Sequence, residues 1–156
     1  MRRDESVWDY PRPPALDPSP EVVEVYWAGH RLVYTSRSIR VLETSHPPTY
    51  YFHPDDVDTG LLQAVPGTTY CEFKGPASYF DLVLDDRRVK RPVWCYPHPT
   101  EGFREIAGWY SLYPRFMDSC LVDGEEIVSQ EGSYYGGWIT PGIRGPFKGG
   151  PGTAGW

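Results

Sequence analysis

Short runs of β-branched and aromatic residues, in which larger apolar side chains often alternate with polar ones, follow one another through the middle of the chain. Alternation at period two is typical of strands, and the glycines, prolines and aspartates between the runs mark turns. The strongest hairpin signal is Asp123-Gly124, which stands between two apolar runs. The pattern predicts a mainly β fold of antiparallel strands, at residues 21–27, 31–35, 39–44, 49–53, 68–73, 77–84, 88–90, 93–96, 109–113 and 120–128.

Two segments carry signals for short helices. Residues 100–107 begin at Thr100, a possible N-cap, and end just before Gly108, which suits a helix C-terminus. Residues 55–62 follow Pro54 and open with acidic residues, which predicts a short helix or 3₁₀ turn there.

Both ends of the chain are rich in residues that interrupt regular structure. Residues 1–20 contain five prolines among charged residues, which favours an extended N-terminal arm over helix or sheet. Residues 132–156 are dominated by glycine and proline but keep large apolar side chains, so we expect a C-terminal arm that packs on the domain. Residues 21–131 then form one compact β domain, and a chain of 156 residues can bury a sizeable core.

Charge and cysteine content narrow the classes of partner and compartment. The formal net charge is −6, and the 15 Lys and Arg are scattered among 21 acidic residues, so neither nucleic acid nor an anionic membrane is an expected partner. No apolar run approaches the length of a membrane span, and the N-terminus lacks the apolar core of a signal peptide. The three cysteines are an odd number without CxxC spacing, which favours reduced thiols, no disulfide and a cytoplasmic location.

Common catalytic and metal-binding signatures are largely missing from the chain. It has no GxSxG, HExxH or GxGxxG motif and no phosphate-binding loop of the GxxxxGK type. The four histidines match no known ligand spacing with the three cysteines, so we expect no metal and no cofactor.

A cluster of polar and aromatic residues in the central strands is the candidate site. A lysine at a junction between two strands, among aromatic rings and near a carboxylate, is suited to hold an anion or to have a depressed pKa. The alternative is that Lys74 caps a turn in solvent and Glu43 makes an ordinary salt bridge. Cys71 is either a nucleophile or a small buried apolar residue. The candidates for catalysis are Lys74, Glu43 and Cys71, and those for ligand binding are Tyr51, Asp56, Thr69, Tyr79, Tyr96 and Trp138.

Several long segments, in the same order along nearly the whole chain, resemble the domain-of-unknown-function family 427. They are residues 6–13, 40–51, 54–57, 69–75, 77–79, 136–141 and 145–153. The family is sometimes labelled nucleotidyltransferase-like, but the Gly-Ser and paired-Asp metal motif of that chemistry is missing here.

The resemblance implies a fold similar to the β-tent, in which two antiparallel sheets lie roughly orthogonal to each other. Relatives with that fold commonly bind zinc through paired CxxC motifs, which this chain lacks, so neither the metal nor a reductase activity is carried over. The resemblance also implies that the candidate residues at family motif positions share a pocket. The C-terminal motif could serve as a lid or as the contact of a homodimer.

Two functions remain open at this point. In the first, rings of Tyr51, Tyr79, Tyr96 and Trp138 wall a pocket for a polar or anionic small molecule, which is bound or turned over without a cofactor. In the second, an aromatic groove recognises a peptide or another protein without catalysis. The first requires a concave pocket that contains Lys74, and the second requires an open groove and a buried, salt-bridged Lys74.

Overall fold

Strands make up most of the regular structure in a computed structural model, which describes residues 4–71, 73–132, 135–150 and 152–153. The strands are β1 (Glu5–Ser6), β2 (Ala15–Ser19), β3 (Val23–Trp27), β4 (His30–Thr35), β5 (Ser38–Leu42), β6 (Thr49–Tyr51), β7 (Leu62–Cys71), β8 (Gly75–Leu84), β9 (Arg87–Cys95), β10 (Tyr110–Leu112), β11 (Ser119–Val122), β12 (Glu125–Glu126), β13 (Val128–Ser129), β14 (Trp138–Ile139) and β15 (Ile143–Arg144). Short 3₁₀ helices connect some of them: η1 (Val7–Asp9), η2 (Pro54–Asp56), η3 (Thr59–Leu61), η4 (Glu101–Ile106) and η5 (Pro114–Phe116). The prediction of a mainly β fold with antiparallel strands is confirmed.

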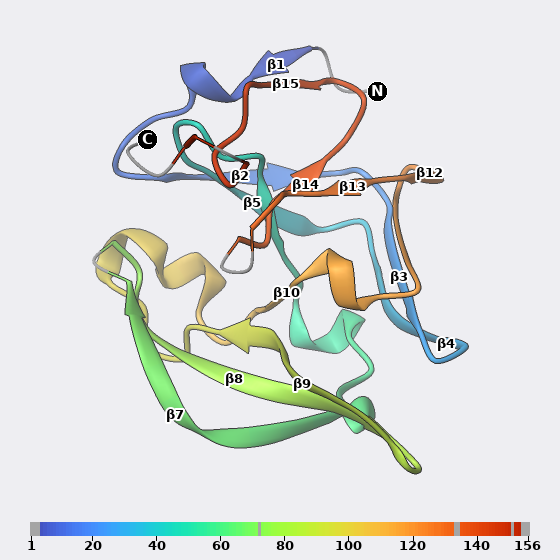
Figure 1. The fold of residues 1–156 in the computed structure, drawn as a ribbon. Helices are drawn as coiled ribbons and strands as arrows, with labels where there is room; N and C mark the ends of the chain where they lie inside the picture. The colour runs from blue at the N-terminus through green and yellow to red at the C-terminus, as the bar shows by residue number, and fades with distance from the viewer. Residues whose placement is uncertain (1–3, 72, 133–134, 151, 154–156) are drawn as a thin grey trace.

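The strands of the described residues are divided among five sheets, a finer division than the two sheets that the family resemblance implied. Two sheets have four strands each, in the orders β10-β9-β8-β7 and β12-β11-β3-β4, and a third has the order β2-β5-β6. The two remaining sheets are the pairs β13-β14 and β1-β15, of which β1-β15 is parallel. In Figure 1, β7, β8 and β9 form the lower part of the molecule, β1 and β15 lie at the top, and β2 and β5 lie between them.

Turn chemistry explains the hairpins that the sequence indicated. Asp123 and Gly124 have φ angles of 50° and 82°, and both values are positive, as the tight turn between β11 and β12 requires. Ala28 and Gly29 turn the chain from β3 into β4 in the same way, with φ angles of 52° and 77°. The predicted helix at 100–107 is the 3₁₀ helix η4, and the Thr100 hydroxyl donates to the carbonyl of Phe73 instead of capping it.

The N-terminal segment is more regular than its prolines suggested. Ala15–Ser19 forms β2 and pairs along its whole length with β5, although residues 1–20 were expected to be an extended arm. Because β2 is an edge strand, Pro18 can stand in it without removing a hydrogen bond that an inner strand would need.

Described parts of the C-terminal segment contact the rest of the chain. Trp138 in β14 is fully buried, with its ring centroid 4.9 Å from that of Tyr50 and 5.8 Å from that of Phe52. Further along, β15 pairs with β1, so the two ends of the chain meet in one small sheet.

Adjacent residues of β6 belong to two different parts of the core, because side chains alternate between the faces of a strand. Tyr50 joins one cluster with Trp27, Leu112 and Trp138, while Tyr51 joins a second cluster. The second cluster is rich in aromatic residues and consists of Ile39, Val41, Tyr51, Ala77, Trp94, Tyr96, Phe103 and Ile106.

Two further observations concern membranes and thiols. No helix in the described residues has the length and apolar character that crossing a bilayer requires. Cys71, Cys95 and Cys120 are all free thiols, of which Cys95 and Cys120 are buried.

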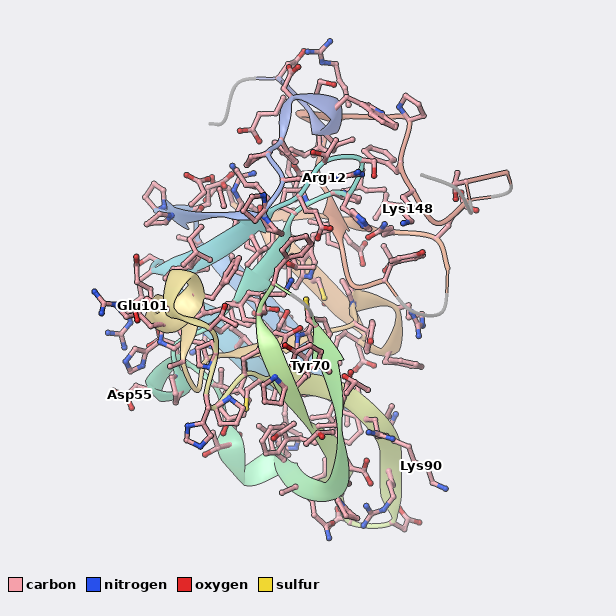
Figure 2. All side chains as sticks on the ribbon, turned by 90° about the vertical axis from the view of Figure 1, so that its left-hand side faces the viewer. Arg12, Asp55, Tyr70, Lys90, Glu101 and Lys148 are labelled. Carbon is pink, nitrogen blue, oxygen red and sulfur yellow. The ribbon has the colours of Figure 1, made fainter. Side chains whose placement is uncertain are left out.

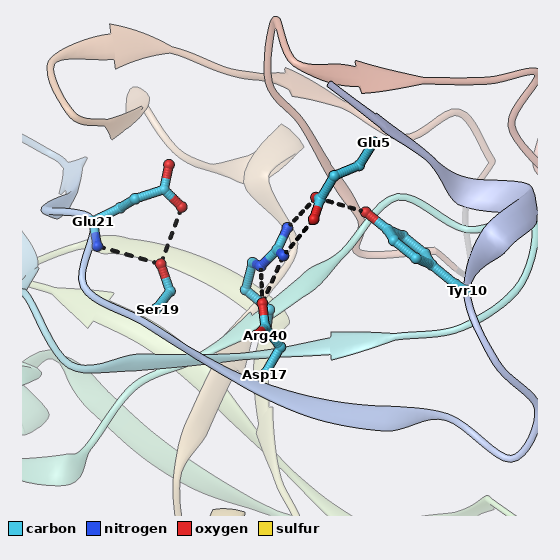
Figure 3. Close-up of polar contacts among 6 residues, drawn as sticks. All are labelled: Glu5, Tyr10, Asp17, Ser19, Glu21 and Arg40. Atoms are coloured by element: carbon cyan, nitrogen blue, oxygen red, sulfur yellow. Dashed lines mark hydrogen bonds and ion pairs between the residues drawn. The ribbon is translucent and has the colours of Figure 1, made fainter. Parts of the chain in front are cut away.

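One buried cation on β5 links the two N-terminal strands β1 and β2. Arg40 of β5 has a side chain that is only 1% exposed, and its guanidinium contacts Glu5 of β1 at 2.9 Å and Asp17 of β2 at 2.6 Å (Figure 3). The Tyr10 hydroxyl donates to the same Glu5 carboxylate at 3.1 Å. Two acids therefore neutralise a charge that would be costly to bury alone.

We expect Arg40→Met to lower the free energy of unfolding by about 3 kcal/mol, because it removes the buried cation that both the Glu5 and the Asp17 carboxylates contact. This value is at the low end for a broken buried pair, since Glu5 and Asp17 remain 26% and 34% exposed. Urea denaturation measures the loss. Arg37→Met is the matched control, because Arg37 pairs with Asp56 at the surface with 53% of its side chain exposed. Equal losses in the two variants would contradict this role of Arg40.

Candidate functional site

A cavity of about 200 Å³ lies where the β2-β5-β6 sheet, the β10-β9-β8-β7 sheet and the C-terminal segment meet. Val41, Thr49 and Tyr51 reach it from β5 and β6, and Tyr79 and Trp94 reach it from β8 and β9. The complete lining is Val41, Glu43, His46, Pro47, Thr49, Tyr51, Lys74, Tyr79, Trp94, Tyr96, Tyr113, Gln130, Tyr135 and Gly136.

Aromatic side chains form much of the cavity wall, and they contact one another. The indole nitrogen of Trp94 donates to the Tyr51 hydroxyl at 3.1 Å, and the ring centroids of Tyr51 and Tyr96 are 6.3 Å apart. Burial raises the pKa of the Tyr51, Tyr96 and Tyr113 phenols above its ordinary value. These phenols are therefore neutral at physiological pH, and their hydroxyl groups can donate hydrogen bonds.

Lys74 brings a positive charge to this aromatic wall. The residue is only 8% exposed, and its Nζ lies 5.8 Å from the ring centroids of both Tyr96 and Phe103. Its own carbonyl accepts a hydrogen bond from the backbone N–H of Thr100 at 3.0 Å, which fixes the turn between β7 and β8. Among the described residues, no carboxylate lies within 4.0 Å of Lys74 Nζ, and no side chain or backbone group accepts a hydrogen bond from it. The burial of Lys74 excludes the alternative of a lysine that caps a turn in solvent.

Glu43 lies in the same cavity but forms no ion pair with Lys74. Its Oε2 is 3.9 Å from Nε2 of His46, which also lines the cavity. On its other side, Nδ1 of His46 is 3.3 Å from the amide nitrogen of Gln130. Burial lowers the pKa of His46, Glu43 opposes this effect, and the positive charges of Lys148, Arg12 and Lys74 add to it.

Two predicted site residues lie elsewhere. Asp56 is in η2, where its carboxylate accepts hydrogen bonds from the Thr35 hydroxyl at 2.7 Å and from Arg37. These bonds, chiefly the one from Arg37, lower the pKa of Asp56 and give it a structural partner. Trp138 does not line the cavity, because β14 directs its ring into the other core cluster beside Tyr50. The assignment of both residues to the pocket is therefore corrected.

Thr69 and Cys71 lie next to the cavity but do not line it. The Thr69 hydroxyl is 2.7 Å from that of Tyr79, so it contacts the wall from outside. Cys71 is partly buried and packs against the aromatic cluster that contains Tyr51 and Tyr96. Of the nine candidates, the cavity contains Glu43, Tyr51, Lys74, Tyr79 and Tyr96.

Sequence reasoning missed several of the lining residues. Trp94 is in a predicted strand, so the period-two pattern could have placed it on the same face as Tyr96. For Gln130 no local signal was available, because its contact with His46 spans 84 residues of sequence.

The comparison with protein families gives a match over most of the chain. A family model described as a domain of unknown function, DUF427, matches residues 15–123, which is more than half of the chain. The chain belongs to the DUF427 family. No curated protein matches it.

The DUF427 match begins at β2 and ends at the turn after β11, so part of the cavity lies outside it. Gln130, Tyr135 and Gly136 come from the segment that follows the matched residues. Gly136 packs so closely against Trp94 that a Cβ added to this glycine would lie 2.6 Å from the Trp94 ring. The C-terminal segment thus completes a site whose other walls belong to the DUF427 domain.

We expect His46 to lower the free energy of unfolding at mildly acidic pH. In the unfolded chain a histidine takes up a proton near pH 6.5, at roughly its ordinary pKa, whereas burial holds the pKa of folded His46 lower. The unfolded state therefore binds more protons in this window, and stability is lost as the pH falls from about 7 toward about 5.

Urea denaturation at a series of pH values measures this effect in the native chain and in His46→Gln. The variant should lose less stability than the native chain between about pH 7 and about pH 5. Identical pH profiles would show that His46 is not held neutral.

Proposed function

We propose that this DUF427 chain binds a small organic acid, with the carboxylate of the acid against Lys74. The observation that carries the proposal is a buried ammonium group that lines a cavity and has no acidic partner among the described residues. A buried charge without a partner is costly, so a cavity that presents one is suited to a ligand of opposite charge.

The wall around Lys74 supports a planar, compact ligand. Tyr51, Trp94 and Tyr96 offer ring faces and edges against which a flat group can pack, and the neutral phenols can donate to acid oxygens. Pockets for drug-sized ligands usually measure roughly 300–1,000 Å³. A cavity of about 200 Å³ favours a ligand smaller than a nucleotide.

The same observations weigh against the interaction-module hypothesis. That hypothesis needs an open groove and a Lys74 neutralised by a salt bridge, whereas Lys74 has no such partner in the described part of the chain. Cys71, the candidate nucleophile, does not line the cavity. We therefore propose binding as the function and assign no covalent step.

Benzoate is a suitable probe because it is flat, small and carries one carboxylate. We expect titration calorimetry to give a dissociation constant at least about tenfold weaker for Lys74→Met than for the native chain, since a hydrogen-bonded charge is lost. Lys74→Arg should retain part of the affinity. Benzamide, which has the same shape without the charge, should bind the native chain more weakly than benzoate.

Lys90→Met is the matched control, because Lys90 is an exposed lysine on β9 that does not line the cavity. In Figure 2 it lies far from Arg12 and Lys148, whose charges act on His46 of the cavity. The Lys90→Met variant should leave benzoate affinity unchanged. Benzoate affinity that is the same in the native chain and in folded Lys74→Met, or no binding by the native chain, would overturn the proposal.

A further inference from the structure

Glu43 is the second charged group in the cavity, and its carboxylate has no hydrogen-bond donor among the described residues. The nearest basic atom is Nε2 of His46, at 3.9 Å, which is beyond hydrogen-bond distance. Whether His46 neutralises Glu43 therefore depends on the protonation of the imidazole.

The side-chain amide of Gln130 has one defined orientation. Its Oε1 accepts from the backbone N–H of Gly137 at 3.1 Å, and its Nε2 donates to the backbone carbonyl of Lys148 at 2.7 Å. A backbone N–H can only donate and a carbonyl can only accept, so exchanging the amide oxygen and nitrogen would break both bonds. The amide nitrogen consequently faces His46.

This orientation determines the state of the imidazole. An amide NH₂ group 3.3 Å from Nδ1 of His46 is a donor, so Nδ1 accepts and carries no proton. The proton of the neutral ring is then on Nε2, the nitrogen nearest Glu43. Burial and the positive charges of Lys148, Arg12 and Lys74 also favour the neutral ring, while Glu43 is the one group named here that opposes it. Tyr135 packs on the ring with centroids 5.6 Å apart.

A neutral His46 leaves the Glu43 carboxylate without a contacting cation. The cavity then holds one ammonium group, several phenol donors and one carboxylate that can accept hydrogen bonds. We propose that the organic acid bound at Lys74 also carries a hydrogen-bond donor, a hydroxyl or an amine, which binds to Glu43. This inference rests on the proposed function and specifies the chemical class of its ligand.

Substituted benzoates test the inference directly. The probes are benzoates with a methyl, hydroxymethyl or aminomethyl group at the meta or para position, which differ mainly in the donor at one end. We expect a donor-bearing probe to bind at least about tenfold more tightly than its methyl counterpart, because a hydrogen bond to a charged acceptor is among the stronger ones. A methyl probe that binds as tightly as both of its donor-bearing counterparts would overturn the inference.

Glu43→Gln separates the two possible donors, since the amide keeps an acceptor oxygen but loses the charge. If the ligand donor is an amine, the advantage of the aminomethyl probe should largely disappear in this variant. If it is a hydroxyl, the hydroxymethyl probe should keep part of its advantage. An advantage that is undiminished in Glu43→Leu would place the donor elsewhere and contradict the inference.

Failure of the inference and failure of the proposed function give different results. If all the probes bind with equal affinity and all depend on Lys74, the proposed function holds and the role of Glu43 is wrong. If no probe binds the native chain, both proposals are wrong.

Long-range hydrogen–nitrogen correlation NMR on the ligand-free chain examines the histidine itself. At neutral pH we expect His46 to show a protonated Nε2 and an unprotonated Nδ1, and Gln130→Leu should let the other tautomer or the charged ring appear. His53 is the internal reference, because its Nδ1 accepts from the backbone N–H of Asp55 at 3.0 Å and should not respond to Gln130→Leu. A protonated Nδ1 at His46 in the native chain would overturn the argument.

Discussion

The contact of Arg40 with two acids holds together the parts of the chain that surround the cavity. Glu5 and Asp17 come from β1 and β2, and Arg40 is on β5 directly before Val41, which lines the cavity. Because β1 pairs with β15, the same contact also anchors the far end of the C-terminal segment. That segment carries Gln130, and the state of His46 depends on Gln130. A fold with many short strands thus depends on one buried charge with well-matched partners.

The two buried cations Arg40 and Lys74 differ in their partners, and we assign a structural role to Arg40 and a binding role to Lys74. Arg40 contacts two carboxylates, and its planar guanidinium suits such a fixed arrangement. Lys74 is almost as deeply buried, but among the described residues it forms no ion pair with a carboxylate, and its Nζ lies near the rings of Tyr96 and Phe103. Since ring contacts offset only part of the cost of removing an ammonium group from water, Lys74 is the residue at which binding an anion would stabilise the fold.

Local pattern predicted much of the fold and part of the candidate site. Turn residues such as Asp123-Gly124 and the alternation of strands are short-range signals, and Lys74 stood out because it lies between two strands. The errors have a common physical origin, since a local pattern does not give the distant partner that a side chain meets in the fold. Asp56 of a predicted helical turn and Trp138 of the predicted C-terminal arm were assigned to the pocket, yet Asp56 pairs with Arg37 and Trp138 packs beside Tyr50. Contacts between distant segments, such as that of His46 with Gln130, were outside the reach of any local pattern.

The most direct test of the account is to observe the Lys74 ammonium group itself while benzoate is added. Nitrogen-15 NMR of the lysine side chains in the native chain reports the environment of each Nζ separately, with Lys90 as an exposed reference. We expect a saturable change in the Lys74 signal that follows the fraction of benzoate bound, with the Lys90 signal unchanged. Benzoate that binds without altering the Lys74 signal, or that shifts both lysines alike, would contradict the central claim that this buried cation is the anion-binding group of the cavity.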